Sequence, residues 1–181
     1  MGNGMAATVP GHRAPFLYAA VMDLGAQLHA ELVLRGQTVS CAESLTGGAV
    51  AEALSASPGA SESFVGGVVS YATAVKVGLL GVPETLVEEH GVVSAQCAEA
   101  MADGARRLLG TDWAVSTTGV AGPDTQEGKP VGLVYVGVAG ASGVVTHRLA
   151  LAGDRQAVRA GAVRAALTEL LEALTGVGGT R

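Results

Sequence analysis

The stretch QTVSCAESLTGG, at residues 37–48, decides the fold that we expect for this chain. It predicts a short strand over Gln37–Cys41, a polar turn that ends in two glycines, and then a helix over Ala49–Ser55. In open α/β sheets, ligands bind in the crevice outside the carboxyl ends of the strands. The stretch therefore predicts an α/β fold and indicates where a site would lie.

The apolar pattern around this stretch predicts alternating helices and strands. Further helices are expected over residues 17–36, 84–90, 94–109 and 154–174, with Ser94 and Asp154 as N-caps. Strands are expected over residues 64–71, 113–117, 131–138 and 144–151. Helices alternate with strands early, and a pair of strands arrives late. This order predicts an α/β fold with a three-layer arrangement, in which helices cover both faces of a mixed β-sheet.

One domain accounts for the 181 residues of the chain, which is an ordinary domain length. We expect this domain to span residues 15–176, because no linker or internal repeat interrupts them. Residues 1–14 and 177–181 contain glycines and no periodic apolar pattern. We therefore expect a flexible N-terminal arm and a flexible tail.

Charge and composition argue against two classes of partner and favour a third. A net charge of -5 repels nucleic acid, so direct nucleic acid binding is not expected. No apolar run could span a bilayer and no secretion signal is recognisable, so we expect a cytoplasmic protein without membrane contact. Charged residues make up only 15% of the chain, which predicts a buried subunit interface and a homo-oligomer, with a dimer favoured. Cys41 and Cys97 lie in apolar segments and are expected to be buried free thiols.

Ser44 lies where the first predicted strand ends. A helix that starts at such a turn offers unpaired backbone N–H groups to a phosphate or an oxyanion, which makes Thr46, Gly47 and Gly48 candidate binding residues. The Ser44 hydroxyl is a candidate nucleophile, although a role as a helix N-cap without catalytic function stays open. The neighbouring Glu43 is expected to be a surface or an orienting carboxylate.

A second polar turn, STTGVAGP at residues 116–123, follows the strand expected over residues 113–117. Its hydroxyl groups and glycines suit contact with a phosphate or a ribose, so the candidate binding residues are Thr117, Thr118, Gly119 and Gly122. Alternatively, the turn needs its glycines only for their backbone dihedral angles.

A serine nucleophile needs a base, and Lys76 is the candidate. The four histidines are expected to be surface or capping residues. Lys76 is the only lysine or arginine between Arg35 and Arg106, and it lies in an apolar stretch. Desolvation that lowers its pKa by about three units would make the amine a base. Lys76 could instead extend its ammonium group to water, and Tyr71 could relay a proton or be an ordinary buried tyrosine.

Familiar cofactor and metal signatures are missing from the sequence. It contains no Walker A, G-x-G-x-x-G, G-x-S-x-G or H-E-x-x-H motif. Metal dependence therefore has no support in the sequence, and no metal ion is expected.

Several short segments, taken together, are similar to one known family. They are AESLTGG at residues 42–48, PGAS at 58–61, GVVSY at 67–71 with Lys76 and LLGV at 79–82, HGVVS at 90–94, TGVAGP at 118–123, KPVG at 129–132 and GDR at 153–155. In this order they resemble the carboxy-terminal domain of CinA, the nicotinamide-nucleotide amidohydrolases, over about residues 28–175.

The resemblance implies an enzyme of pyridine nucleotide recycling that needs no cofactor. It would deamidate a small nucleotide substrate, nicotinamide mononucleotide, to nicotinate mononucleotide and ammonia. By motif position, Ser44 would be the nucleophile, Lys76 its base, and Tyr71 a neighbour that assists proton transfer. This agrees with the general requirement that a serine nucleophile be activated by an adjacent base.

The resemblance also implies a substrate-binding set. The backbones of residues 46–48 and 117–122 would hold the oxyanion and the phosphate, and Arg155 would contact the substrate. Leu45 stands where many family members have Cys, which should be silent if the side chain only packs. DTQE at residues 124–127 replaces a more glycine-rich loop and is expected to alter the substrate pocket.

A hypothesis from another class is a non-catalytic nucleotide-binding or interaction protein, linked to competence or the DNA-damage response. In that case the glycine turns would hold a ligand without turnover. Lys76 separates the two hypotheses, because a binding module does not need a desolvated base.

Overall fold

The computed structural model describes residues 14–176 of the chain. Its helices are α1 (Ala14–Arg35), α2 (Ala49–Ser55), α3 (Thr73–Gly78), α4 (Glu84–His90), α5 (Ala95–Leu109) and α6 (Arg155–Thr175), with a short 3-10 helix at Ala60–Glu62. Its strands are β1 (Val39–Glu43), β2 (Phe64–Val69), β3 (Trp113–Gly119), β4 (Leu133–Gly140) and β5 (Gly143–Ala150). The predicted arm lies outside the described residues except for Ala14, which begins α1, and the predicted tail at 177–181 lies outside them entirely.

The strands form one mixed sheet in the order β2-β1-β3-β4-β5. β1 lies between β2 and β3 and is parallel to both, whereas β4 and β5 continue the sheet as antiparallel strands. β1 is buried along its whole length, as expected for a central parallel strand that is covered on both faces. Because β1 and β3 are parallel neighbours, with Glu43 opposite Thr117, their carboxyl ends open at the same edge of the sheet.

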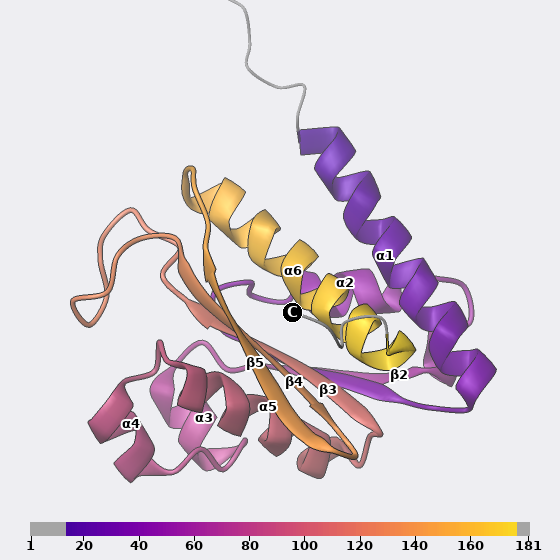
Figure 1. Cartoon of the computed structure of the whole chain (residues 1–181), viewed down its shortest axis with the longest axis horizontal. Coiled ribbons are helices and arrows are strands. Elements are labelled where there is room, and N and C mark those ends of the chain that lie inside the picture. Colours follow the sequence, from indigo (N-terminus) through magenta and orange to yellow (C-terminus); the bar gives the residue numbers. More distant parts are fainter. Residues whose placement is uncertain (1–13, 177–181) are drawn as a thin grey trace, which may run out of the picture.

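Helices cover both faces of this sheet (Figure 1). α1, α2 and α6 pack together on one face, and α3, α4 and α5 lie on the other. One apolar cluster, which includes Leu28 and Leu167, fills the space under α1 and α6, and a second, which includes Met101, lies between α5 and the sheet. The predicted three-layer α/β arrangement is confirmed.

Both predicted N-caps are present. The Ser94 hydroxyl accepts a hydrogen bond from the Cys97 N–H at the start of α5, and the Asp154 carboxylate accepts one from the Ala157 N–H at the start of α6. Each cap satisfies a backbone N–H group that helix geometry leaves without an intrahelical partner.

Some local features differ from the sequence prediction. No helix is predicted for Thr73–Gly78, yet these residues form α3, which is too short to show a helical apolar period. The strand predicted over residues 64–71 ends at Val69, the strand predicted from residue 131 begins at Leu133, and β3 extends to Gly119. Cys41 and Cys97 are buried free thiols, as predicted. None of the helices within residues 14–176 has the length and apolar composition needed to cross a membrane.

Candidate active site

A polar cavity of about 320 Å³ lies at the carboxyl edge of the parallel strands. Ser44 and Leu45, directly after β1, and residues 118–124, at and beyond the end of β3, line it. The wall is completed by residues around α3 and by Arg155 at the start of α6. The cavity is therefore found where the two polar turns indicate a site.

Ser44 and Lys76 meet in this cavity although they are far apart in the sequence. The Nζ of Lys76 donates to the Oγ of Ser44 at 3.2 Å and to the carbonyl oxygen of Ser70 at 2.6 Å. A longer contact of 3.5 Å joins the same Nζ to the carbonyl oxygen of Tyr71. The carbonyls fix the amine beside the serine hydroxyl, within reach for proton transfer. The hydroxyl and the amine thus lie at the distance that an activated serine requires of its base.

The path of the chain explains how these two residues come together. β2 is parallel to β1, so the chain leaves both strands at the same edge of the sheet. The N–H of Ser70 donates to the carbonyl oxygen of Glu43 at 2.8 Å, which ties the end of β2 to the end of β1. α3 begins at Thr73, and its Lys76 side chain reaches back to Ser44.

The side chain of Lys76 is buried, with only 1% of the residue exposed. Burial disfavours the ammonium form and lowers the pKa of Lys76, while the negative charges of Cys97, when ionised, and of Glu127 oppose this shift. A lowered pKa enlarges the fraction of neutral amine, which is the form that can accept a proton from Ser44. The alternative in which Lys76 extends its ammonium group to water is therefore wrong.

Glu43 is fully buried at the end of β1, which excludes a surface position for its carboxylate. Its oxygens accept hydrogen bonds from the N–H groups of Gly48 at 2.9 Å, Val50 at 3.1 Å and Ala51 at 2.8 Å. The carboxylate thus occupies the positive start of α2, where an anionic ligand would otherwise bind.

As a result, part of the predicted binding set does not line the cavity: Thr46, Gly47, Gly48 and Thr117. The hydroxyls of Thr46 and Thr117 lie 2.7 Å apart, and both residues are buried. The N–H of Gly48 is bound by Glu43. The turn after β1 is held by contacts within the protein, and for this reason its glycine end is not open to a ligand.

The remaining residues predicted in the second turn do line the cavity: Thr118, Gly119 and Gly122. The hydroxyl of Thr118 donates to the carbonyl oxygen of Val92 at 2.6 Å, so its proton supports the cavity wall. A Cβ at Gly119 would lie 2.6 Å from the carbonyl oxygen of Leu133. Close backbone packing therefore requires glycine at this position.

Arg155 and Tyr71 lie together in the wall of the cavity. Arg155 donates through Nη2 to the Tyr71 hydroxyl and through Nη1 to the carbonyl oxygen of Gly122, both at 2.8 Å. Tyr71 is 58% exposed, so the alternative of a buried tyrosine is wrong. Within residues 14–176, its hydroxyl makes no hydrogen bond to Ser44 or Lys76. Its position beside a guanidinium group suits substrate binding.

Comparison with known proteins identifies the family. The family model described as the CinA C-terminal domain matches residues 22–174. The chain belongs to the CinA C-terminal domain family.

Relatives of this CinA domain include much longer proteins. A CinA-like protein of Frankia casuarinae is 49% identical over 146 residues, which cover 81% of this chain and 34% of that protein. A CinA-like protein of Anaeromyxobacter dehalogenans is 51% identical over 147 residues, covering 80% of this chain and 36% of that protein. The chain therefore spans about a third of the length of these curated relatives.

Crystal structures show the same CinA fold. A competence-damaged protein (CinA) superfamily protein of Klebsiella pneumoniae matches with a TM-score of 0.83 and 34% identity, over 86% of this chain and 98% of that one. The competence/damage inducible protein CihA of Agrobacterium tumefaciens matches with a TM-score of 0.82 and 34% identity, over 94% of this chain and 99% of that one. None of these names states a reaction.

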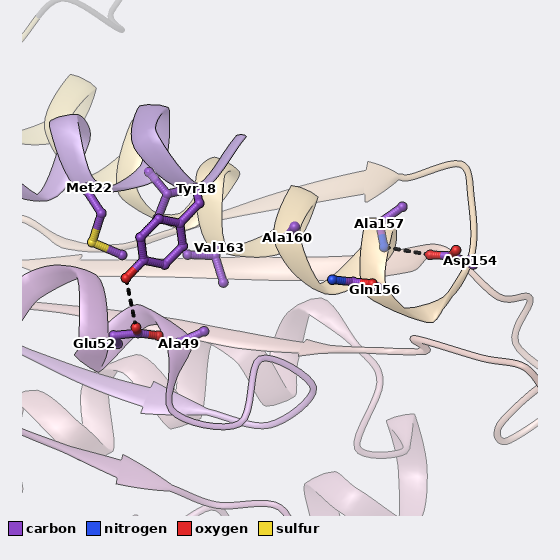
Figure 2. Close-up of a pocket in the computed structure, with 10 residues that line it drawn as sticks. Tyr18, Met22, Ala49, Glu52, Asp154, Gln156, Ala157, Ala160 and Val163 are labelled. Carbon is purple, nitrogen blue, oxygen red and sulfur yellow. Dashed lines mark hydrogen bonds between the residues drawn. The ribbon is translucent and has the colours of Figure 1, made fainter. Parts of the chain in front are cut away.

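The CinA domain has a second cavity, of about 380 Å³, between α1, α2 and α6 (Figure 2). Its lining is mainly apolar and includes Met22 and Val163. On its rim, the Tyr18 hydroxyl donates to the Glu52 carboxylate at 3.2 Å. No serine, lysine, histidine or cysteine lines this cavity, so it lacks a serine nucleophile with an amine base. The smaller, polar cavity is the candidate active site.

Some residues of the CinA site escaped the sequence analysis. Thr73 lines the cavity from α3, which is not predicted, and Val92 and Val93 line it from the junction between α4 and α5. The only signal for this junction is the HGVVS segment of the family resemblance. Residues 124–126, which are expected to alter the pocket, do line it. Within residues 14–176, no three His, Cys, Asp or Glu side chains are grouped so that they could hold a metal ion.

Proposed function

We propose that this CinA domain hydrolyses the carboxamide of nicotinamide mononucleotide to nicotinate mononucleotide and ammonia. The observation that carries the proposal is the 3.2 Å contact between the Ser44 hydroxyl and the buried Lys76 amine. The family resemblance supports the choice of substrate, and the contact supports the assignment of Ser44 as nucleophile and Lys76 as base. The proposal concerns this domain alone, because the chain spans only about a third of its curated relatives.

The first half of the reaction forms an acyl-enzyme. Neutral Lys76 takes the proton of Ser44 while the serine oxygen attacks the carboxamide carbon. Backbone N–H groups would hold the resulting oxyanion. Leu45 is a candidate donor, because it lines the cavity and its N–H has no hydrogen-bond partner within residues 14–176. The Lys76 ammonium then gives its proton to the leaving nitrogen, and ammonia departs.

The second half of the reaction releases the acid. Water attacks the acyl carbon while Lys76 takes one of its protons, and the tetrahedral intermediate collapses to nicotinate mononucleotide. The proton on Lys76 returns to the oxygen of Ser44, which restores the starting state. No group outside the cavity is needed for the proton balance.

The charges around the cavity suit this substrate. The nucleotide has an anionic phosphate and a cationic pyridinium ring. Arg155 supplies a guanidinium group for the phosphate, and Asp124 is the carboxylate among the lining residues. We assign phosphate binding to Arg155 and contact with the pyridinium ring to Asp124.

Ammonia release from nicotinamide mononucleotide tests the proposal directly. Ser44→Ala and Lys76→Met should each lower kcat at least about 1000-fold, because nucleophile and base act as one unit. Ser55→Ala is the matched control, since this exposed serine bonds only to the Glu52 carbonyl oxygen within the described residues and should keep full activity. Circular dichroism checks that each variant is folded. Undiminished turnover in a folded Ser44 or Lys76 variant contradicts the mechanism, and nucleotide binding without turnover by the natural protein favours the non-catalytic hypothesis.

A further inference from the structure

The loop that follows the second turn is fastened to the junction between α4 and α5 through Glu127. The carboxylate of Glu127 accepts hydrogen bonds from the N–H of Val92 at 3.0 Å and from the N–H of Val93 at 3.3 Å. It also pairs with the ammonium of Lys129 at 3.0 Å, and this ammonium donates to the carbonyl oxygen of His90 at 2.9 Å. We call Glu127, Lys129 and the two valine N–H groups the latch.

The backbone around the latch is shaped to allow these contacts. Glu127 has a φ of 53°, and it is the one non-glycine residue in the left-handed region within residues 14–176. Such a conformation costs free energy and persists where surrounding contacts hold it. A Cβ at Gly91 would lie 2.8 Å from the Glu127 Cδ and 2.8 Å from the Lys129 Nζ. Glycine at position 91 therefore leaves the space that the ion pair occupies.

The latch joins two parts of the cavity wall. Asp124, Thr125 and Gln126 line the cavity directly before Glu127, and Val92 and Val93 line it on the side to which Glu127 is bonded. The loop 124–126 is otherwise exposed, and its backbone is closed by a pairing of Gln126 with Lys129. If the latch opens, the loop loses its connection to the α5 side of the cavity.

The negative charge of Glu127 also affects the pKa of Lys76, the proposed base. Burial opposes ionisation of Glu127, but hydrogen bonds from Val92, Lys129 and Val93 outweigh it and lower the pKa of this carboxyl. Glu127 is therefore ionised at neutral pH, and its negative charge raises the pKa of Lys76, against the larger lowering by burial. The same carboxylate thus acts on the shape of the cavity and on the ionisation of its base.

We propose that Glu127 is a positioning residue for the amidase reaction: through the latch it fixes the loop 124–126 as a wall of the substrate pocket and so determines how tightly the nucleotide is held. This inference rests on the proposed function.

Steady-state kinetics with nicotinamide mononucleotide test whether the latch fixes the loop 124–126 as a wall of the substrate pocket. At a pH above the acidic limb, where Lys76 is neutral with or without Glu127, Glu127→Ala should raise KM at least about tenfold while kcat stays within about threefold, because under these conditions it removes binding and not chemistry. Lys129→Met should raise KM less, since both valine N–H groups keep their acceptor. Glu88→Ala is the matched control, because this exposed α4 glutamate has no hydrogen-bond partner within the described residues and should leave KM unchanged.

The pH profile supplies a readout that a merely structural role would not move. The groups around Lys76 that can carry charge are Cys97 on α5, Asp124, Glu127 and Lys129 in the loop, Arg155 on α6, and the phenol of Tyr71. Glu127→Gln removes one negative charge at nearly constant shape, so the pKa of Lys76 should fall. The acidic limb of kcat/KM should then move to lower pH, and Glu88→Gln should leave it in place.

The outcomes separate this inference from the proposed function. If the natural protein turns the nucleotide over but Glu127→Ala keeps its KM, the role of the latch is refuted alone. If Glu127→Ala raises KM but Glu127→Gln leaves the acidic limb in place, the role of the latch in the cavity wall stands and the charge effect on Lys76 is refuted. If the natural protein neither binds nor hydrolyses the nucleotide, the proposed function and the role of Glu127 fall together.

Discussion

The two glycine turns that follow β1 and β3 look alike in sequence, but their backbone groups have different partners. In the first turn, the N–H of Gly48 and the N–H groups at the start of α2 are bound by Glu43. In the second, Gly119 and Gly122 line the cavity, and the carbonyl oxygen of Gly122 accepts a hydrogen bond from Arg155. A polar glycine turn after a strand therefore indicates a ligand site only if no acidic side chain of the protein already binds its N–H groups. The first turn is held by contacts within the protein, and the second forms part of the cavity wall.

Breaking the first turn should have the largest effect on stability. Glu43→Ala removes a buried carboxylate that accepts three backbone N–H hydrogen bonds, and it should lower the free energy of unfolding by about 3 kcal/mol or more. Glu43→Gln keeps an acceptor oxygen and should lose less. Urea denaturation measures both variants. A loss under about 1 kcal/mol for Glu43→Ala would show that the carboxylate does not organise the turn.

Adding one methyl group to each turn sharpens the comparison. Gly119→Ala forces a Cβ to within 2.6 Å of the Leu133 carbonyl oxygen and should cost about 2 kcal/mol of unfolding free energy. Gly47→Ala meets only the Arg159 guanidinium at 3.3 Å but needs a φ of +62°, so about 1 kcal/mol is expected. Thermal or urea unfolding measures which of the two variants loses more unfolding free energy. Equal losses would mean that small shifts relieve the contact at position 119, because Gly119, unlike Gly47, does not have a positive φ.

The pH dependence of kcat/KM tests whether the first turn presents its serine to a neutral amine. The ammonium form of Lys76 is inactive in the proposed mechanism, so activity should rise with pH until the pKa of Lys76 is passed, by at most about tenfold per unit. Burial lowers that pKa, so the rise should end below the ordinary lysine value of about 10.4. A profile without an acidic limb would argue against Lys76 as the base.

The smallest effect on activity is expected for Tyr71, which lies outside the second turn and is linked to it through Arg155. Tyr71→Phe removes the hydrogen bond from Arg155 Nη2 but leaves the bond from Nη1 to the Gly122 carbonyl oxygen. KM for the nucleotide should rise about threefold, and kcat should change little. A fall in kcat of about 100-fold or more would instead support the predicted role of Tyr71 in proton transfer.

Much of the fold could be predicted because its signals are local. The caps Ser94 and Asp154, and the change from strand to helix around residues 37–55, depend on neighbouring residues only. The position of β1 between β2 and β3 could not be predicted, because strand order is set by contacts between distant segments. α3 was missed since six residues cannot show a helical period.

The site was predictable in part for the same reason. Ser44 and Lys76 were selected from local polarity and from the family resemblance, but only the parallel pairing of β1 with β2 brings them together. The roles of Glu43 and Glu127 depend on which N–H groups their carboxylates reach. The sequence places both residues beside a turn and does not reveal those partners.

The two buried thiols make local opening of the fold measurable by chemical modification. Burial raises the pKa of Cys97 to about 11 and that of Cys41 well above its usual range, so both stay as unreactive thiols at neutral pH. Alkylation by iodoacetamide therefore has to wait for a local excursion of the fold. The alkylation rate at Cys97 measures how often α5 opens locally, and the alkylation rate at Cys41 measures how often β1 does. No probe has to be introduced.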